Sequence, residues 1–128
     1  MILDSKSLTR LSDVHVDLQK VIALAAENWT DKKVIWKITE GRRTVERQRM
    51  LVRQKKSQTM KSRHITGHAV DFAVFVDGEL DWTFKYYILV SNAIKAAAKK
   101  LKIAIEWGGD WKSFKDGPHI QLTWKAYP

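Results

Sequence analysis

The chain has 128 residues, a length that fits one domain with a substantial core and is short for two. Lysine and arginine total 23 against 14 acidic residues, so the formal net charge of +9 predicts attraction to an anionic polymer or surface. The absence of cysteine excludes disulfide frameworks, iron–sulfur clusters, thiolate zinc sites and cysteine nucleophiles. A metal site in this chain would therefore use histidine, aspartate and glutamate.

The N-terminal segment Met1–Ser7 includes Asp4 and Lys6, where a secretory signal would need an uninterrupted apolar stretch. No later segment approaches the roughly 20 apolar residues of a membrane-spanning helix. The chain also has no internal repeat and no linker rich in proline, glycine or serine. We therefore expect a soluble protein that is made in the cytoplasm without a signal peptide and folds as one domain over residues 1–128.

The first half of the chain predicts a helix, a strand and a second helix. Apolar residues at helical spacing predict a helix over Val14–Asn28, with Ser12 and Asp13 as capping residues at its start. The β-branched and aromatic segment Val34–Thr39 predicts a strand. A polar helix over about Thr44–Lys56 follows.

The second half predicts a loop, a buried strand, a long helix and two short strands, in that order: Ser57–His68, Ala69–Val76, Trp82–Lys102, Ile103–Trp107 and His119–Trp124. The last strand alternates, with His119, Gln121 and Thr123 on the face opposite Ile120, Leu122 and Trp124. Because the elements lack a regular strand–helix rhythm, the pattern favours a single α+β domain in which helices pack on a small antiparallel or mixed sheet.

An aspartate within the predicted apolar strand, Asp71, is unfavourable to bury unless it is paired, hydrogen-bonded or bound to a metal. His64 lies seven residues upstream, and His119 begins the last predicted strand on its polar face. Two histidines and one carboxylate form the three-ligand set of a catalytic zinc site, which keeps a fourth position for water. Each residue alone also fits an ordinary polar position, so the prediction of Zn²⁺ rests on the set.

Two acidic residues are candidates for the general base. Asp116 lies three residues before His119, and Pro118 restricts the backbone between them, so its carboxylate is expected close to the metal yet free to accept a proton. Glu106, at the end of a predicted strand, is the alternative base or a hydrogen-bond partner of a ligand histidine.

A second histidine close to His64 needs a separate interpretation. His64 and His68 have the spacing of paired zinc ligands on a helix. No glutamate follows His64 directly, however, and Gly67 argues against a helix at this point. His68 is therefore expected to flank the site or to bind substrate.

Basic residues cluster between positions 42 and 63, and most of them are expected to form a solvated helix face. Arg43 is the exception, because it follows Gly41 at the end of a predicted strand and can bind a carboxylate or a developing oxyanion. Trp107 and Trp111 bracket a glycine pair near His119 and are expected to shape the wall of a cleft.

Two blocks of the sequence resemble a known family. Ser62–Asp71 matches the pattern Ser-x-His-x-x-Gly-x-Ala-x-Asp, and Trp107–Trp111 followed by Asp116–Leu122 matches the second block. Glu40–Thr44 is similar to the substrate-arginine segment of that family, and with Val14–Leu18 the resemblance extends over nearly the whole chain. The chain resembles the zinc D-Ala-D-Ala carboxypeptidase and L-alanyl-D-glutamate endopeptidase family, especially its short phage endolysins.

The resemblance implies the fold that this family shares with lysostaphin-type enzymes and the sonic hedgehog domain. It implies zinc ligation by His64, Asp71 and His119, with Asp116 as the catalytic base and Arg43 at the substrate or the tetrahedral intermediate. These roles agree with those inferred from the residues. Peptidoglycan stem peptide is the implied substrate, and the expected substrate contacts are Arg43, Gln48, His68 and Trp111.

The expected activity is hydrolysis of the L-Ala-D-Glu bond by a monomeric phage endolysin without a separate cell-wall-binding domain. It would be made in the host cytoplasm and act on peptidoglycan in the periplasm after membrane permeabilisation, with its positive charge holding it on the anionic cell envelope. A D-alanyl-D-alanine carboxypeptidase shares the motifs and is the first alternative. A metal-bearing but inert domain is the second. A basic nucleic-acid-binding module is the third, and it leaves Asp71 and Asp116 unexplained, so nucleic acid is not an expected partner.

Overall fold

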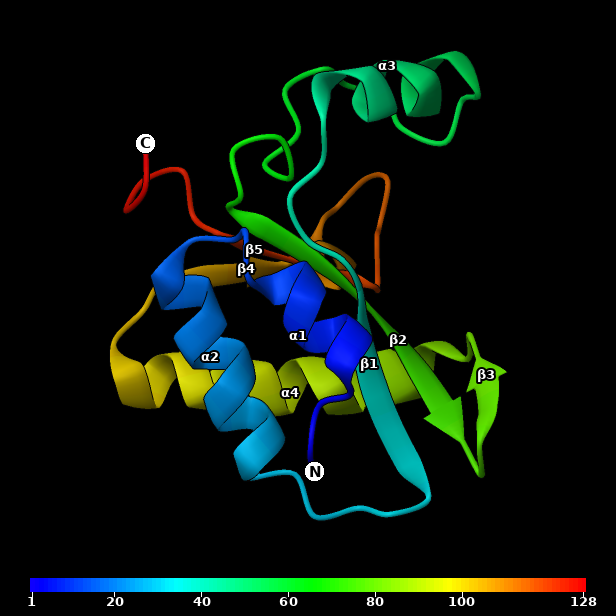
Figure 1. Ribbon diagram of the computed structural model, residues 1–128, viewed down its shortest axis with the longest axis vertical. Helices are drawn as coiled ribbons and strands as arrows, with labels where there is room; N and C mark the ends of the chain where they lie inside the picture. Colours follow the sequence, from blue (N-terminus) through cyan, green and yellow to red (C-terminus); the bar gives the residue numbers. More distant parts are fainter.

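The computed structural model describes residues 1–128 as helices packed on an antiparallel sheet (Figure 1). The sheet has the order β1-β2-β5-β4, and β3 forms a hairpin with the end of β2. This confirms the expected α+β class and makes the sheet antiparallel throughout. In chain order the elements are α1 Ser5–Leu11, α2 Val16–Glu27, β1 Val34–Glu40, α3 Val45–Arg53, β2 Ala69–Val76, β3 Glu79–Asp81, α4 Phe84–Leu101, β4 Ile105–Trp107, the 3-10 helix η1 Gly108–Asp110 and β5 His119–Leu122.

Side-chain alternation divides the sheet into an apolar face and a polar face. The core residues of β2 and β5 are Val70, Phe72, Val74, Ile120 and Leu122. The residues between them, Asp71 on β2 and His119 and Gln121 on β5, point to the opposite side because successive side chains alternate along a strand. The register pairs Asp71 with His119, and Gln121 with Glu106 of β4. Four polar side chains from three strands therefore lie together on one face.

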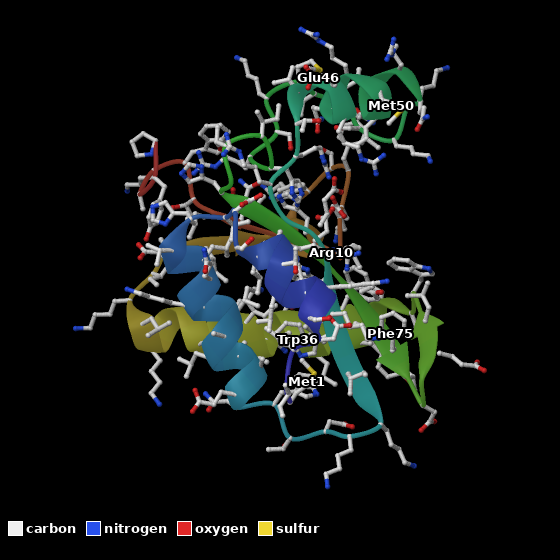
Figure 2. All side chains as sticks on the ribbon, viewed as in Figure 1. Met1, Arg10, Trp36, Glu46, Met50 and Phe75 are labelled. Carbon is white, nitrogen blue, oxygen red and sulfur yellow. The ribbon has the colours of Figure 1, made fainter.

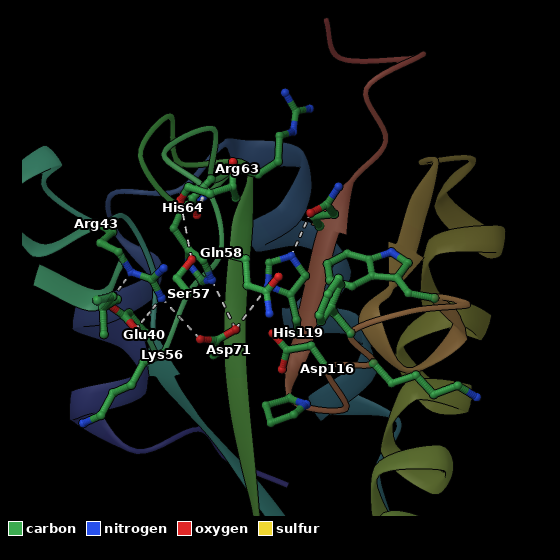
Figure 3. A pocket seen from close by; sticks show the side chains of 18 of the residues that line it. Glu40, Arg43, Lys56, Ser57, Gln58, Arg63, His64, Asp71, Asp116 and His119 are labelled. Carbon is green, nitrogen blue, oxygen red and sulfur yellow. Dashed lines mark hydrogen bonds and ion pairs between the residues drawn. The ribbon is translucent and has the colours of Figure 1, made fainter. Parts of the chain in front are cut away.

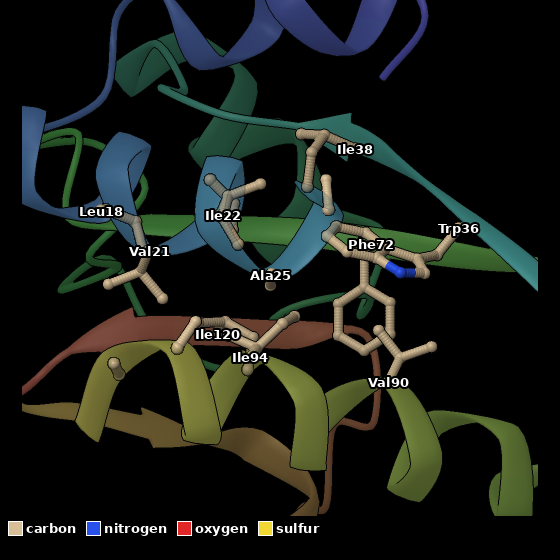
Figure 4. Packing of buried hydrophobic residues seen from close by; sticks show 14 of the residues in the cluster. Leu18, Val21, Ile22, Ala25, Trp36, Ile38, Phe72, Val90, Ile94 and Ile120 are labelled. Carbon is tan, nitrogen blue, oxygen red and sulfur yellow. The ribbon is translucent and has the colours of Figure 1, made fainter. Parts of the chain in front are cut away.

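Helices α2 and α4 cover the apolar face of the sheet (Figures 1 and 4). Their inward apolar residues and those of the strands form one core of 22 buried residues. Leu18 and Ile22 of α2 and Ile94 of α4 are fully buried in it, together with Phe72 and Ile120 of the two central strands. This packing fixes β2 and β5, the strands that carry the polar face, from behind.

Helix α1 is an element that the sequence analysis did not predict. Its N-cap is Asp4, whose side chain accepts a hydrogen bond from the Ser7 amide at 2.8 Å. The predicted cap of the next helix was consequently wrong, because Ser12 is the C-cap residue of α1. Helix α2 begins two residues later than predicted, and the ring nitrogen Nδ1 of its N-cap His15 accepts from the Asp17 amide at 3.0 Å.

Helix α1 also holds an irregularity in β1. The Ile38 amide donates to Ser7 Oγ at 3.0 Å, and Arg10 donates to the Ile38 carbonyl at 3.0 Å. The register of β1 against β2 shifts directly after Ile38, so that Glu40 becomes the cross-strand neighbour of Asp71. This bulge places a second carboxylate on the polar face.

Two predicted strands are shorter than expected. Strand β4 begins at Ile105 because Lys102 ends helix α4 in the left-handed conformation, at φ 58°, and the Ile103 amide bonds back to the helix. Strand β5 ends at Leu122, so Trp124 does not join the apolar face. Trp124 is exposed instead, and the Arg63 guanidinium lies over its ring at 4.0 Å.

Helix α3 projects from the body of the domain, within the long connection from β1 to β2 (Figures 1 and 2). It begins at Thr44, whose hydroxyl accepts from the Arg47 amide at 3.0 Å. Only Gln48 and Leu51 of this helix are buried, whereas Glu46 and Met50 face outward (Figure 2). No helix of the structure is both long enough and apolar enough to cross a membrane.

Candidate metal centre and active site

Three potential metal ligands converge on the polar face of the sheet (Figure 3). Asp71 and His119 are cross-strand partners, and His64 lies in the loop before β2. Asp71 Oδ1 lies 3.1 Å from His64 Nε2 and 3.3 Å from His119 Nδ1. One ligand atom of each residue lies within 4.8 Å of those of the other two. The three donors expected from the sequence are thus brought together.

The hydrogen bonds behind the two histidines fix their tautomers. His64 Nδ1 lies 2.8 Å from the Gly41 carbonyl oxygen, which can only accept, so this nitrogen carries the proton. His119 Nε2 lies 2.7 Å from Gln121 Oε1, while the amide nitrogen of Gln121 donates to Glu106 Oε1 at 2.5 Å. In the neutral rings, the lone pairs of His64 Nε2 and His119 Nδ1 therefore face a carboxylate oxygen. Three converging lone pairs fit a bound cation such as Zn²⁺.

The charge balance favours an ionised carboxylate at the centre of the site. Burial opposes the charge of Asp71, but His119 and His64, when each ring also carries a proton on the nitrogen that faces Asp71, donate hydrogen bonds that hold the pKa of its carboxyl well below its usual range. Burial lowers the pKa of His119, but the hydrogen bond and charge of Asp71 outweigh it and raise this pKa overall. Asp71 therefore remains an anionic ligand at neutral pH.

Arg43 supports Asp71 and is itself held in place. Its guanidinium lies 3.5 Å from Asp71 Oδ2 and donates to both oxygens of Glu40, at 2.8 and 2.7 Å. Burial disfavours the charged Glu40 carboxylate, yet Arg43 lowers its pKa below the ordinary value. Gln48 accepts a further hydrogen bond from Arg43 Nη1 at 2.7 Å. Of the five N–H groups of the arginine, three donate these hydrogen bonds and one on Nη2 faces Asp71, so the remaining one, on Nη1, has no partner in the protein.

Asp116 lies beside His119 and Asp71 at the floor of the site (Figure 3). The Asp116 amide donates to the Gly108 carbonyl at 3.0 Å, and a Cβ on Gly108 would collide with the Asp116 backbone. Glycine at position 108 therefore lets the loop before β5 approach. Burial and the negative charge of Asp71 raise the pKa of Asp116 above its ordinary value. A carboxylate in this position can accept and return a proton.

The site opens into a cleft of about 920 Å³. Its floor is the polar face of the sheet, and its two walls are the segment after α3 and the loop after η1. Arg43 and Trp111 line this cleft, and the Trp111 ring lies 5.1 Å from that of His119. These two residues lie where the sequence analysis expected substrate contacts.

The other two expected substrate residues lie elsewhere. Gln48 is fully buried and does not line the cleft; its amide donates to Ser57 Oγ and the Thr59 carbonyl, so it links Arg43 to the following loop. His68 lies outside the cleft as well, with its ring 5.5 Å from that of His15. The described contacts of these two side chains are with the protein itself, and their expected contact with substrate stays a prediction.

Glu106, expected as either a base or a partner of a ligand histidine, is bound to Gln121, which in turn holds His119. The sequence analysis missed Gln121 and Glu40 as supports of the metal ligands. Gln121 was detectable, since it lies two residues after His119 on the same face of the strand. Glu40 was not, because the bulge in β1 that aligns it with Asp71 depends on the unpredicted helix α1.

An open cleft that contains three residues able to hold a metal ion, beside a carboxylate with a raised pKa, has the arrangement of a hydrolytic metal site. A family model described as phage L-alanyl-D-glutamate peptidase matches residues 1–123, and the chain belongs to this family. The chain is 35% identical to an L-alanyl-D-glutamate peptidase of Listeria phage A118, over 96% of its own length but only 43% of that protein's. It is 33% identical to an L-alanyl-D-glutamate peptidase of Escherichia phage T5, over 89% of this chain and 92% of the relative.

A solved structure supports the same family. The L-Ala D-Glu endopeptidase ChiX of Serratia marcescens superimposes with a TM-score of 0.89 and is 44% identical in sequence. The match covers 97% of this chain and 91% of that one. The α+β fold described above is therefore that of a solved L-Ala D-Glu endopeptidase.

Proposed function

We propose that the chain is a zinc-dependent endopeptidase that hydrolyses the L-alanyl-D-glutamate bond of peptidoglycan stem peptides. The observation that carries the proposal is the convergence of the lone pairs of His64, Asp71 and His119 beside Asp116, in a cleft open to a peptide. Membership of the peptidase family supports the choice of bond. The catalytic unit lies within residues 1–128.

In this proposal His64 binds zinc through Nε2, His119 through Nδ1 and Asp71 through its carboxylate. Bound Zn²⁺ supplies Lewis-acid chemistry, which polarises a carbonyl oxygen and makes water more acidic. The Gly41 carbonyl and Gln121 keep the protons of the two rings on the outer nitrogens. The two rings therefore need no change of tautomer to receive the ion.

Asp116 acts as the general base and then as the general acid. Its carboxylate removes a proton from the water whose oxygen attacks the alanyl carbonyl carbon, and it then gives that proton to the glutamyl nitrogen as the C–N bond breaks. The remaining N–H of Arg43 stabilises the negative charge that develops on the carbonyl oxygen. Trp111 forms one wall against the substrate backbone.

The biological role that we propose is that of an endolysin in host cell lysis. The protein would be made in the host cytoplasm and reach the periplasmic peptidoglycan after the membrane is permeabilised. The exposed positive charge of the chain would hold the monomeric enzyme on anionic components of the envelope.

The test is digestion of purified peptidoglycan by the wild type and by the Asp116→Asn variant, each with measured zinc content. New D-glutamyl N-termini produced only by the wild type, with zinc retained in both, would support the proposal. Release of terminal D-alanine alone would instead identify the carboxypeptidase alternative. Absence of zinc from the purified wild type after supplementation, or equal activity of the two proteins, would overturn the mechanism.

A further inference from the structure

The cleft contains cationic side chains of two kinds. The two arginines that line it already contact polar groups of the protein: Arg43 binds Glu40, Gln48 and Asp71, and Nη2 of Arg63 donates to three backbone carbonyls at 3.3, 3.4 and 2.6 Å. The lysines have no such contacts. Four exposed lysines line the cleft without an acidic partner within 4.0 Å: Lys55, Lys56, Lys61 and Lys115.

Three of these lysines belong to one wall. Lys55 and Lys56 directly follow α3, and Lys61 lies in the loop that leads to His64. Figure 3 shows Lys56 on the side of the cleft that carries Glu40 and Arg43, across from Asp116. Lys115 alone belongs to the opposite loop. We refer to Lys55, Lys56 and Lys61 as the lysine wall.

The proposed substrate has its negative charge on one side of the scissile bond. Glutamate has two carboxyl groups, and the peptide chain can continue through only one of them. An L-Ala-D-Glu bond therefore always has a second carboxyl group on the residue that provides the leaving nitrogen, and this group is anionic at neutral pH unless it is amidated. The alanyl side chain on the other side is neutral.

Resting on the proposed function, we infer that the lysine wall binds the second carboxylate of the D-glutamyl residue. The wall then draws this carboxylate toward the α3 side of the cleft, while the leaving nitrogen stays within reach of Asp116. It also makes the enzyme discriminate between stem peptides in which this carboxyl is free and those in which it is a primary amide. The amide keeps the shape of the carboxylate but loses its charge.

The experiment compares two synthetic stem peptides that differ only in this group, a free carboxylate or a primary amide. Ion pairs between the three lysines and the substrate carboxylate are partly exposed to solvent, so each is expected to be weaker than a buried pair. Together they are expected to make kcat/KM of the wild type about tenfold higher for the carboxylate peptide than for the amide peptide. The preference arises in KM because the lysines contact a group that does not react. It is expected to shrink as the salt concentration rises.

The decisive variant is Lys55→Gln/Lys56→Gln/Lys61→Gln, in which the ratio of the two kcat/KM values is expected to fall to about one. The matched control is Lys20→Gln/Lys99→Gln/Lys100→Gln, which removes the same charge from exposed positions of α2 and α4 outside the cleft. This control is expected to keep the wild-type ratio. All six lysines are exposed, so both proteins should fold, and thermal unfolding and zinc content would check this.

Equal cleavage of the two peptides by the wild type, or a preference that survives in the lysine-wall variant, would overturn the inference and leave the proposed activity standing. A loss of preference in both triple variants would assign it to net charge and would also overturn the inference. If folded, zinc-loaded enzyme cut neither peptide between alanine and D-glutamate, both the inference and the proposed function would fail.

Discussion

One face of the β2–β5 pair is apolar and the other is polar, although alternate residues of the same two strands form both faces. On β5, Ile120 is fully buried against helices α2 and α4, while His119 and Gln121 on either side of it belong to the polar face. The apolar face holds the strand by packing, and the polar face holds its side chains by hydrogen bonds.

The difference shows how the molecule separates stability from function. Each of the three proposed metal ligands is held from behind by a polar group: His64 by the Gly41 carbonyl, Asp71 by Arg43 and His119 by Gln121. Such a face can be rigid without an apolar core of its own, because the core lies on the other side of the same strands. Substitutions on the two faces should therefore affect different measurements.

The largest expected effect is on the rate of catalysis. Asp116→Asn keeps the size of the side chain but removes the base, so kcat is expected to fall by about 10²–10⁴-fold. Zinc content and the free energy of unfolding should change little, because Asp116 is not among the three ligands. The measurement is hydrolysis of a synthetic L-Ala-D-Glu peptide.

The matched control for that variant is Asp110→Asn. Asp110 is exposed, lies in η1 near the same loop and pairs with Lys95 outside the cleft. It is expected to keep wild-type kcat. A similar loss of kcat in both variants would mean that the loop, and not the Asp116 carboxylate, determines the rate.

On the apolar face, Ile120→Ala is expected to lower the free energy of unfolding by about 2–5 kcal/mol, since it leaves a cavity in a fully packed core. Urea unfolding of the metal-free protein would measure this change. The zinc ligands on either strand are unchanged, so the folded fraction should still bind zinc. A loss of zinc affinity larger than the loss of stability would show that the two faces are coupled.

On the polar face, Gln121→Leu is expected to weaken zinc binding by about 10–100-fold, because His119 Nε2–H loses its acceptor. Glu106→Gln should have a smaller effect, since a glutamine oxygen can still accept from the Gln121 amide. Competition with a chelator measures the affinity without reference to activity. Equal zinc affinity of all three proteins would contradict a role of this chain of hydrogen bonds in positioning His119.

The sequence analysis predicted the parts of the molecule that depend on local pattern. The alternation in residues 119–122 predicted both faces of β5, and the motif around His64 pointed to the three residues that the fold brings together as a possible metal site. It could not identify the bulge that aligns Glu40 with Asp71, since Ser7 and Arg10 of a short polar helix hold it from about 30 positions away.

The positions of Gln48 and His68 outside the cleft could not be predicted for a related reason. In the sequence both are polar side chains in segments close to the candidate site. Their actual environments are made by residues distant in the sequence: Gln48 is enclosed when the chain returns at Thr59, and the ring of His68 lies against that of His15. Exposure, which decides between contact and support, is a property of the tertiary fold.

The smallest expected effect concerns His68, outside the cleft. Burial, with the positive charge of Arg63 and the neighbouring His15, lowers the pKa of His68 below its ordinary value of 6.5. The neutral ring is therefore favoured in the folded state, so its contribution to stability is present above about pH 6.5 and is lost as the pH falls below that value. His68→Asn removes this titration, and the thermal midpoint of the metal-free variant should fall less between pH 7 and pH 5 than that of the wild type. If the thermal midpoints of the two proteins fell equally between pH 7 and pH 5, protonation of His68 would not contribute to the loss of stability in acid.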